Sequence, residues 1–274
     1  MATAQRPARS FEATLGVMRI SNKTVLIAGA SSGIGRSLAL ELAKRSNRII
    51  VTARRKERLD ELVAEIEALG GAALAVEADA LVEDEAARVV RAAVERFERI
   101  DVAVLNVGDG PVLNMAHITA RQVLDNMRVN YDTFVHYLIP VMEHMKPFRQ
   151  GMIVHTNSLA GFLGLPMQGP YSAAKSAARI LMDTCRIELR EYNLKFISIH
   201  PGFIKTETQL GYDQPMPMAL SEEQAARQMI RAMEKGSADY MFPWIYKMLI
   251  KLAGLLPKRL LGKFLLIDLP ADYG

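Results

Sequence analysis

Short apolar runs rich in β-branched residues alternate, from Thr24 onward, with longer segments of helical periodicity. This alternation is typical of a parallel sheet whose connecting helices cover both of its faces. Strands are expected at 24–28, 48–52, 72–77, 102–105, 151–156 and 195–200, with a short further strand at 239–242. Helices are expected at 34–45, 56–69, 83–97, 121–145 (bent or broken near Asn130), 171–192 and 222–235. The pattern predicts an α/β fold, a single doubly wound, Rossmann-like domain with a mostly parallel sheet of about seven strands and helices on both faces.

The segments outside this pattern set the expected boundaries of the domain. Residues 1–20 have no apolar signal-peptide region and are interpreted as a flexible N-terminal tail. Residues 21–243 form the domain, because α/β sheets of about 250 residues often fold as one unit. Residues 244–274 form a C-terminal amphipathic extension. Ser221 and Gln224 have the spacing of a capping box, so the last helix of the domain is expected to begin after Ser221.

Composition and charge exclude several classes of protein. A charged fraction of 23% with an apolar fraction of 50% excludes intrinsic disorder. Cys185 is the single cysteine, so we expect a buried thiol in a reducing, cytoplasmic setting and no intrachain disulfide. A formal net charge of +4 is too small to indicate nucleic-acid binding, and no Cys/His spacing indicates a metal site. The longest stretch without charge is broken by glycines and prolines, which excludes a spanning helix.

A glycine-rich loop connects the first expected strand to the first helix. Glycines at such a turn let the backbone approach a pyrophosphate, whose charge then lies against the free N–H groups of the helix N-terminus. The strand and helix on either side favour this interpretation over a merely tight turn. The residues expected to bind the cofactor here are Gly29, Ser31, Ser32, Gly33, Ile34 and Gly35.

The end of the second strand indicates which dinucleotide is bound. Folds specific for NAD place an acid there for the ribose 2′-hydroxyl, whereas this chain has Arg54, Arg55 and Lys56 and no acid before Glu57. A guanidinium can hold a 2′-phosphate through charge-assisted bonds. NADP(H) is therefore preferred over NAD(H), with Arg54 as the main contact. A solvated helix start is the alternative for these cations, and it fits Lys56 and Arg55 better than Arg54.

Tyr171 and Lys175 open the helix expected at 171–192, on the same helical face. A nearby ammonium stabilises a phenolate, so we expect the pKa of Tyr171 to be lowered from about 10 toward the range of a general acid/base. Many solvated helices contain such a pair, so by itself it is weak evidence for a catalytic site. Together with the glycine loop in the same chain it becomes strong evidence.

With both features present, the chain resembles the short-chain dehydrogenase/reductase family from about Lys23 to Phe242. The resemblance implies a catalytic tetrad of Asn130, Ser158, Tyr171 and Lys175. Tyr171 would give its proton to a carbonyl oxygen that Ser158 orients. Lys175 would bind the nicotinamide ribose, and Asn130 would hold a water of the proton relay.

The resemblance implies further cofactor contacts in the loops after later strands. Asp79 matches an acid that contacts adenine in relatives, although a helix-start acid explains it nearly as well. The motif at the fourth strand reads Leu105-Asn106-Val107-Gly108 and lacks the first of the family's two asparagines. The expected contacts outside the glycine loop are Arg54, Asp79, Ala80, Asn106, Gly108, Tyr171, Lys175, Pro201, Gly202, Ile204 and Thr206.

The family's mobile lid corresponds to a segment near 205–222. Met216 and Met218 within it suit an irregular apolar ligand, and ordinary loop packing explains them equally well. The favoured function is an NADP(H)-dependent reductase of an apolar or lipid-like ketone. The alternatives are an alcohol dehydrogenase working in the oxidative direction and a nucleotide-sensing or scaffold protein without activity. The resemblance also implies a homodimer or homotetramer.

The C-terminal extension carries apolar and cationic residues at helical spacing. Ile245, Met248, Leu249 and Leu252 share one face, while Lys247 and Lys251 share another. Such a stripe can lie in a membrane interface, which would make the protein peripheral to the membrane. It can equally cover the substrate pocket or lie between subunits, which is favoured over membrane contact, although the sequence alone does not decide among the three roles.

Overall fold

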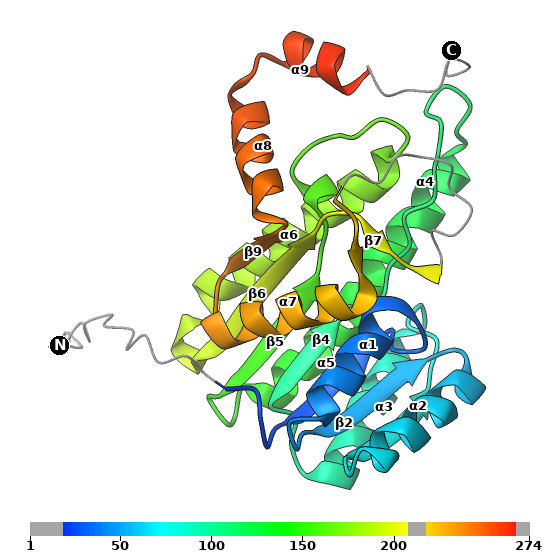
Figure 1. Ribbon diagram of the computed structural model, residues 1–274, viewed down its shortest axis with the longest axis vertical. Coiled ribbons are helices and arrows are strands. Elements are labelled where there is room, and N and C mark those ends of the chain that lie inside the picture. The colour runs from blue at the N-terminus through cyan, green and yellow to red at the C-terminus, as the bar shows by residue number, and fades with distance from the viewer. Residues whose placement is uncertain (1–18, 208–217, 267–274) are drawn as a thin grey trace, which may run out of the picture.

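The parallel sheet predicted from the alternating pattern forms the centre of the computed structural model, which describes residues 19–207 and 218–266 (Figure 1). Within those residues the main sheet has seven strands, all parallel, in the order β3-β2-β1-β4-β5-β6-β9. The strands are β1 (Thr24–Ala28), β2 (Arg48–Ala53), β3 (Ala72–Glu77), β4 (Val102–Leu105), β5 (Gly151–Thr156), β6 (Leu194–Pro201) and β9 (Asp239–Phe242). The predicted Rossmann-like fold is confirmed.

Helices cover both faces of the sheet. They are α1 (Gly33–Ala43), α2 (Lys56–Ala68), α3 (Glu83–Phe97), α4 (Ala120–Met127), α5 (Thr133–Met145), α6 (Gly169–Glu188), α7 (Glu222–Lys235), α8 (Trp244–Leu255) and α9 (Lys258–Leu265). The capping box predicted for α7 is present, because Ser221 Oγ accepts from Gln224 N at 3.2 Å and Ser221 N donates to Gln224 Oε1 at 2.9 Å. The segment expected as one helix to Tyr192 ends as α6, followed by a short 3-10 turn (Arg190–Tyr192).

The predicted break near Asn130 is a π-helical turn (Arg128–Asp132) between α4 and α5. Asn130 is buried there, and its side chain bonds to both backbone groups of Asp109. The amide Nδ2 donates to Asp109 O at 2.6 Å, and Oδ1 accepts from Asp109 N at 3.0 Å. The turn therefore ties the long helix to the loop after β4.

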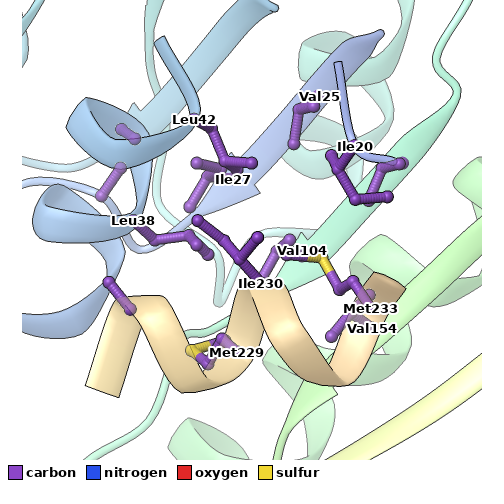
Figure 2. Packing of buried hydrophobic residues seen from close by; sticks show 14 of the residues in the cluster. Ile20, Val25, Ile27, Leu38, Leu42, Val104, Val154, Met229, Ile230 and Met233 are labelled. Carbon is purple, nitrogen blue, oxygen red and sulfur yellow. The ribbon is translucent and has the colours of Figure 1, made fainter. Parts of the chain in front are cut away.

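Alternate residues of each strand pack into two separate cores. Val25 and Ile27 of β1 face the core under α1, α2 and α7, whereas Leu26 and Ala28 face the core under α3, α5 and α6. Figure 2 shows the first core, where Leu38 and Leu42 of α1 meet Ile230 and its neighbours on α7. Because both faces are buried, the strands are apolar almost throughout, as parallel sheets require. The thiol of Cys185 is buried in the second core, as predicted.

The domain begins earlier than the sequence predicted. Ile20 was expected in the flexible tail, but it is only 1% exposed and packs in the first core beside Val25 and Met233 (Figure 2). Its carbonyl accepts from Asn47 Nδ2 at 3.1 Å. The alternating pattern starts only at Thr24, so it could not reveal a single apolar residue held by a distant asparagine.

Two features lie outside the main sheet. A small parallel pair joins β7 (Ile204–Lys205) to β8 (Leu220–Ser221), which the sequence did not predict. The expected lid near 205–222 runs between these strands, and most of it, including Met216, falls outside the described residues. Helices α8 and α9 follow β9 and extend away from the sheet (Figure 1). Across the described chain, each helix is too short or too polar to span a bilayer.

Replacing Ile20 by Ala should lower the free energy of unfolding by about 2–5 kcal/mol, because the substitution leaves a cavity in a well-packed core. Urea denaturation followed by circular dichroism measures this loss. The control is Arg19→Ala at the exposed neighbouring position, which should change stability little. Equal midpoints for Ile20→Ala and the parent would show that the domain does not depend on residue 20.

Candidate active site

A cleft of about 680 Å³ opens at the carboxyl ends of the strands, where ligands bind in open α/β sheets. Its walls come from the loops that follow β1, β2, β3, β4, β5 and β6. The sequence-predicted residues that line it are Gly29, Ser31, Ser32, Gly33, Ile34, Arg54, Asp79, Ala80, Asn106, Gly108, Ser158, Tyr171, Lys175, Pro201, Gly202, Ile204 and Thr206. Gly35 and Asn130 lie behind this lining.

The glycine loop is shaped by close backbone contacts. Gly29 has φ +81° and Gly33 has φ +62°, which L side chains rarely adopt. A Cβ on Gly35 would lie 2.2 Å from Gly29 O, so only glycine lets α1 start this close to β1. Ser32 is the N-cap of α1 and makes no side-chain capping bond. The first N–H groups of α1, which have no partner within the helix, therefore face the cleft as an anion site.

The two arginines after β2 both line the cleft, and Arg55 does more than the sequence predicted. Its Nη2 donates to Ser31 Oγ at 2.8 Å and to Ser32 Oγ at 2.7 Å. Arg55 is exposed and is the N-cap residue of α2, as the helix-start interpretation expected, but its guanidinium also lies across the glycine loop. Side-chain direction after a strand end depends on the loop opposite, so the sequence alone gave no reason to prefer Arg55.

The loops after β3 and β4 form the adjoining wall. Asp79 Oδ1 accepts from Leu81 N at 3.0 Å, so this acid both shapes its turn and lines the cleft. Asn106 Nδ2 donates to Gly29 O at 3.1 Å and ties the β4 end to the glycine loop. A Cβ on Gly108 would lie 2.8 Å from Asn130 Oδ1 and 3.0 Å from Lys175 Nζ, so a side chain there would displace the Asn130 amide or the Lys175 ammonium.

Tyr171, Ser158 and Lys175 come together at one end of the cleft. The Lys175 ammonium lies 5.5 Å from the centre of the Tyr171 ring, and it donates to Thr156 O at 3.1 Å. The Ser158 hydroxyl is hydrogen-bonded to the Tyr171 phenol. The predicted juxtaposition of phenol and ammonium is therefore present in the structure.

The pKa of Tyr171 differs in direction from the prediction. Burial raises it above its usual value of 10.0, the Ser158 hydrogen bond lowers it, and Asp109 raises it. The predicted lowering of this pKa is wrong, because burial makes the largest contribution. Burial also lowers the pKa of Lys175 to about 8. Near neutral pH the phenol therefore holds its proton while the ammonium is still mostly charged.

Asn157 is a supporting residue whose position the sequence did not reveal. It is 3% exposed; its Nδ2 donates to Lys175 O at 2.9 Å, and its Oδ1 accepts from Ser158 N at 2.7 Å. One amide thus fixes the backbone of two predicted site residues. Its only sequence signal was the place directly before Ser158.

A buried histidine, His200, contacts the backbone of the loop that carries Ser158. His200 Nε2 lies 2.8 Å from Asp239 Oδ1, and His200 Nδ1 lies 3.3 Å from Ser158 O. The interaction with His200 lowers the pKa of Asp239. His200 comes from β6 and Asp239 from β9, so their contact joins strands that are distant in the sequence.

The residues present fit a dinucleotide. Glycines keep three close approaches open at positions 29, 35 and 108, and Ser31, Ser32 and two guanidinium groups offer hydrogen-bond donors. Thr156 also lines the cleft, and its buried Oγ1 makes no hydrogen bond within the described residues. No cluster of three or more candidate metal ligands occurs among residues 19–207 and 218–266.

Comparison with known proteins agrees with this geometry. The short chain dehydrogenase family matches residues 23–216. An uncharacterised oxidoreductase of Myxococcus xanthus is 32% identical over 241 residues, which cover 88% of this chain and 95% of that protein. A 3-oxoacyl-[acyl-carrier-protein] reductase of Synechocystis is 33% identical over 192 residues, covering 69% of this chain and 76% of the relative.

A solved structure shows the same fold. The crystal structure of a short-chain type dehydrogenase/reductase from Mycobacterium marinum superposes with a TM-score of 0.76 at 24% identity, covering 84% of this chain and 97% of that one. The family match spans most of the domain, including the glycine loop and the Tyr171–Lys175 pair. The chain belongs to the short-chain dehydrogenase/reductase family of oxidoreductases.

Proposed function

We propose that the protein is an NADP(H)-dependent oxidoreductase that interconverts a ketone and a secondary alcohol, with Tyr171 as the proton donor. Members of its family act on CH–OH or C=O groups and use NAD(P)(H). The observation that carries the proposal is the contact of the Tyr171 phenol with the Ser158 hydroxyl in the cleft, beside the buried Lys175 ammonium.

The proton transfer follows from the charges at this end of the cleft. A bound nicotinamide cofactor would supply the hydride. Ser158 and Tyr171 donate hydrogen bonds to the substrate oxygen, and Tyr171 transfers its proton as negative charge develops there. Lys175 offers charge-assisted bonds to ribose hydroxyls, and Asn130 holds the Asp109 backbone beside it. Because burial keeps the phenol protonated at neutral pH, Tyr171 is in the form that can donate a proton to the substrate oxygen.

The preference for NADP(H) rests on cations at the end of β2. Arg54 and Arg55 line the cleft. The acid that also lines this part of the cleft, Asp79 after β3, accepts a hydrogen bond from Leu81 N through its Oδ1. Arg55 already bridges two hydroxyls of the glycine loop, so a 2′-phosphate would replace neutral acceptors by a charged one. We therefore propose that both arginines hold the 2′-phosphate.

The substrate class and the assembly are parts of the same proposal. The relative from Synechocystis reduces a 3-oxoacyl group, which supports a ketone on an apolar chain. Ile180 and Ile187 on α6 are 57% and 64% exposed, and Leu124 on α4 is 62% exposed. Exposed apolar side chains of this size favour an interface between subunits, in line with the expected homodimer or homotetramer.

Replacing Tyr171 by Phe should lower the rate of NADPH-dependent ketone reduction by about 10²- to 10⁴-fold, because the proton donor is lost. NADPH affinity should stay nearly unchanged. Absorbance at the NADPH band, with a panel of steroid, acyl and small cyclic ketones, measures the rate. Cofactor binding is followed separately by fluorescence.

Tyr240→Phe is the matched control, because Tyr240 lies outside the cleft and its hydroxyl bonds to Gln228 at 3.0 Å. It should retain the parent rate. An unchanged rate in Tyr171→Phe would refute the assignment of the proton donor. A parent protein that binds NADPH but reduces no ketone in the panel would instead favour the nucleotide-sensing alternative.

Replacing Arg54 or Arg55 by Ala should weaken NADPH binding by about 10- to 100-fold while NADH binding changes little, because each variant loses a charge-assisted bond to the 2′-phosphate. Fluorescence titration with both cofactors gives the ratio of affinities. Lys56→Ala is the control, since Lys56 pairs with Asp60 on α2. A parent that binds NADH as tightly as NADPH would contradict the proposed preference.

NADPH affinity should fall as the pH rises through about 8, because Lys175 loses the charge that binds the ribose hydroxyls. The lowered pKa means that the charged form dominates below that pH and the neutral form above it. Titrations between about pH 7 and 9.5, above the range where a phosphate monoester titrates, measure this slope. Lys175→Met should bind weakly with a flat profile, and a slope that persists in this variant would exclude Lys175 as its source.

A further inference from the structure

Helices α8 and α9 both present large apolar side chains to solvent. We call Trp244, Met248, Leu252, Leu255, Leu260 and Phe264 the C-terminal patch. Trp244 is 70% exposed, Leu255 82% and Phe264 62%. Neither helix has a buried residue, so these side chains are not part of a core within the described chain. Exposed apolar surface of this kind marks an interaction site.

The start of α8 is nevertheless fixed to the domain. The Tyr246 ring packs edge-on against Phe203, with ring centres 6.4 Å apart. A Cβ on Gly202 would lie 2.6 Å from Tyr246 Cε2, so the ring lies directly on that glycine. At 100° per residue, Tyr246 and Ile250 point to the side of α8 opposite the patch, and both are partly buried. The patch therefore faces outward because the other side of α8 holds the domain.

Charge distinguishes this surface from an ordinary apolar interface. Between Trp244 and Ile267 the sequence has five cations and no acid: Lys247, Lys251, Lys258, Arg259 and Lys263. At 100° per residue, Lys247 and Lys251 border the apolar arc of α8 on one side. On α9, Arg259 and Lys263 lie about 100° around the helix from Leu260 and Phe264. Each helix thus has a cationic edge beside an apolar face, which is typical of helices that lie in a membrane interface.

We propose that the C-terminal patch docks on the surface of an anionic lipid bilayer, with α8 and α9 lying in the headgroup region. The five cations are complementary to the phosphates of such a surface. A second copy fits less well, because a twofold interface through this patch would bring cations against cations. The segment also lies beyond residue 216, where the match to the family ends.

Docking in this way would bring the cleft to the bilayer. Gly202 lines the cleft and touches Tyr246 on the inner side of α8, so the helix that carries the patch begins at the rim of the cleft. A ketone dissolved in the lipid phase could then enter without crossing bulk water. This last step rests on the proposed function, whereas docking itself does not.

Trp244 provides a direct probe, because it is the single tryptophan in the chain and belongs to the patch. The full-length protein is mixed with vesicles of phosphatidylglycerol and phosphatidylcholine, or of phosphatidylcholine alone, without cofactor or ketone. The anionic vesicles should shift Trp244 emission to the blue and carry the protein down on centrifugation. Added salt should weaken binding, since cations contribute to it.

The variant Leu255→Glu with Phe264→Glu keeps the tryptophan and should bind anionic vesicles at least about tenfold more weakly, because it replaces apolar contacts by negative charge. Leu69→Glu is the control; Leu69 follows α2 and is 49% exposed. Circular dichroism and NADPH binding verify that both variants fold.

Three results would overturn docking on anionic lipid: no binding by the parent, equal binding to both kinds of vesicle, or parent-like binding by the double variant. A fourth result would come from light scattering. If the double variant forms a smaller oligomer than the parent but binds vesicles equally well, the patch is an interface with a second copy of the chain. Because these measurements need no turnover, their failure leaves the oxidoreductase proposal intact. Failure of the Tyr171 test likewise leaves lipid docking intact.

Discussion

The close approach of bare backbone at the carboxyl ends of β1 and β4 is the constraint on which the cleft depends. A Cβ on Gly29 would lie 3.1 Å from Val107 N, and one on Gly35 would lie 2.2 Å from Gly29 O. Because these contacts exclude side chains, the start of α1 stays exposed to the cleft, and Asn106 fastens the two strand ends at 3.1 Å. The ends of β1 and β4 thus form the centre of the cleft. Around them lie the N–H groups at the start of α1, the pair Arg54 and Arg55, and Tyr171 at one end of the cleft.

Burial of a charged amine is the second requirement of the site. Lys175 is only 2% exposed, and its ammonium donates to one backbone oxygen, Thr156 O. Taking an ammonium out of water is unfavourable, which is why its pKa falls. The surrounding structure holds it in place through Asn157, which bonds to Lys175 O, and through glycine at 108. A ligand with hydroxyl groups would complete the coordination of the ammonium.

The local sequence pattern was sufficient to predict the helices and strands. The features that it missed depend on contacts between residues far apart in the sequence. Strand limits at 24–28, 72–77 and 151–156 agree with the structure because alternation and β-branching are local properties. The catalytic residues proposed from motifs also come together, and Asn130, which lies behind the lining, approaches Lys175 at Gly108. Ile20, Arg55 and the His200–Asp239 contact escaped prediction because their partners lie far away in the sequence. The direction of the Tyr171 pKa was missed because burial is not visible in a motif.

The π-helical turn at Arg128–Asp132 changes how the segment from Ala120 to Met145 should be understood. A single wide turn accommodates about one extra residue, which rotates everything after it by about 100° relative to an ideal helix. The buried faces of α4 and α5 are therefore rotated relative to each other about the helix axis. Asn130 lies in the π-helical turn between the two helices, where its amide points inward without displacing the buried residues of α4 or α5.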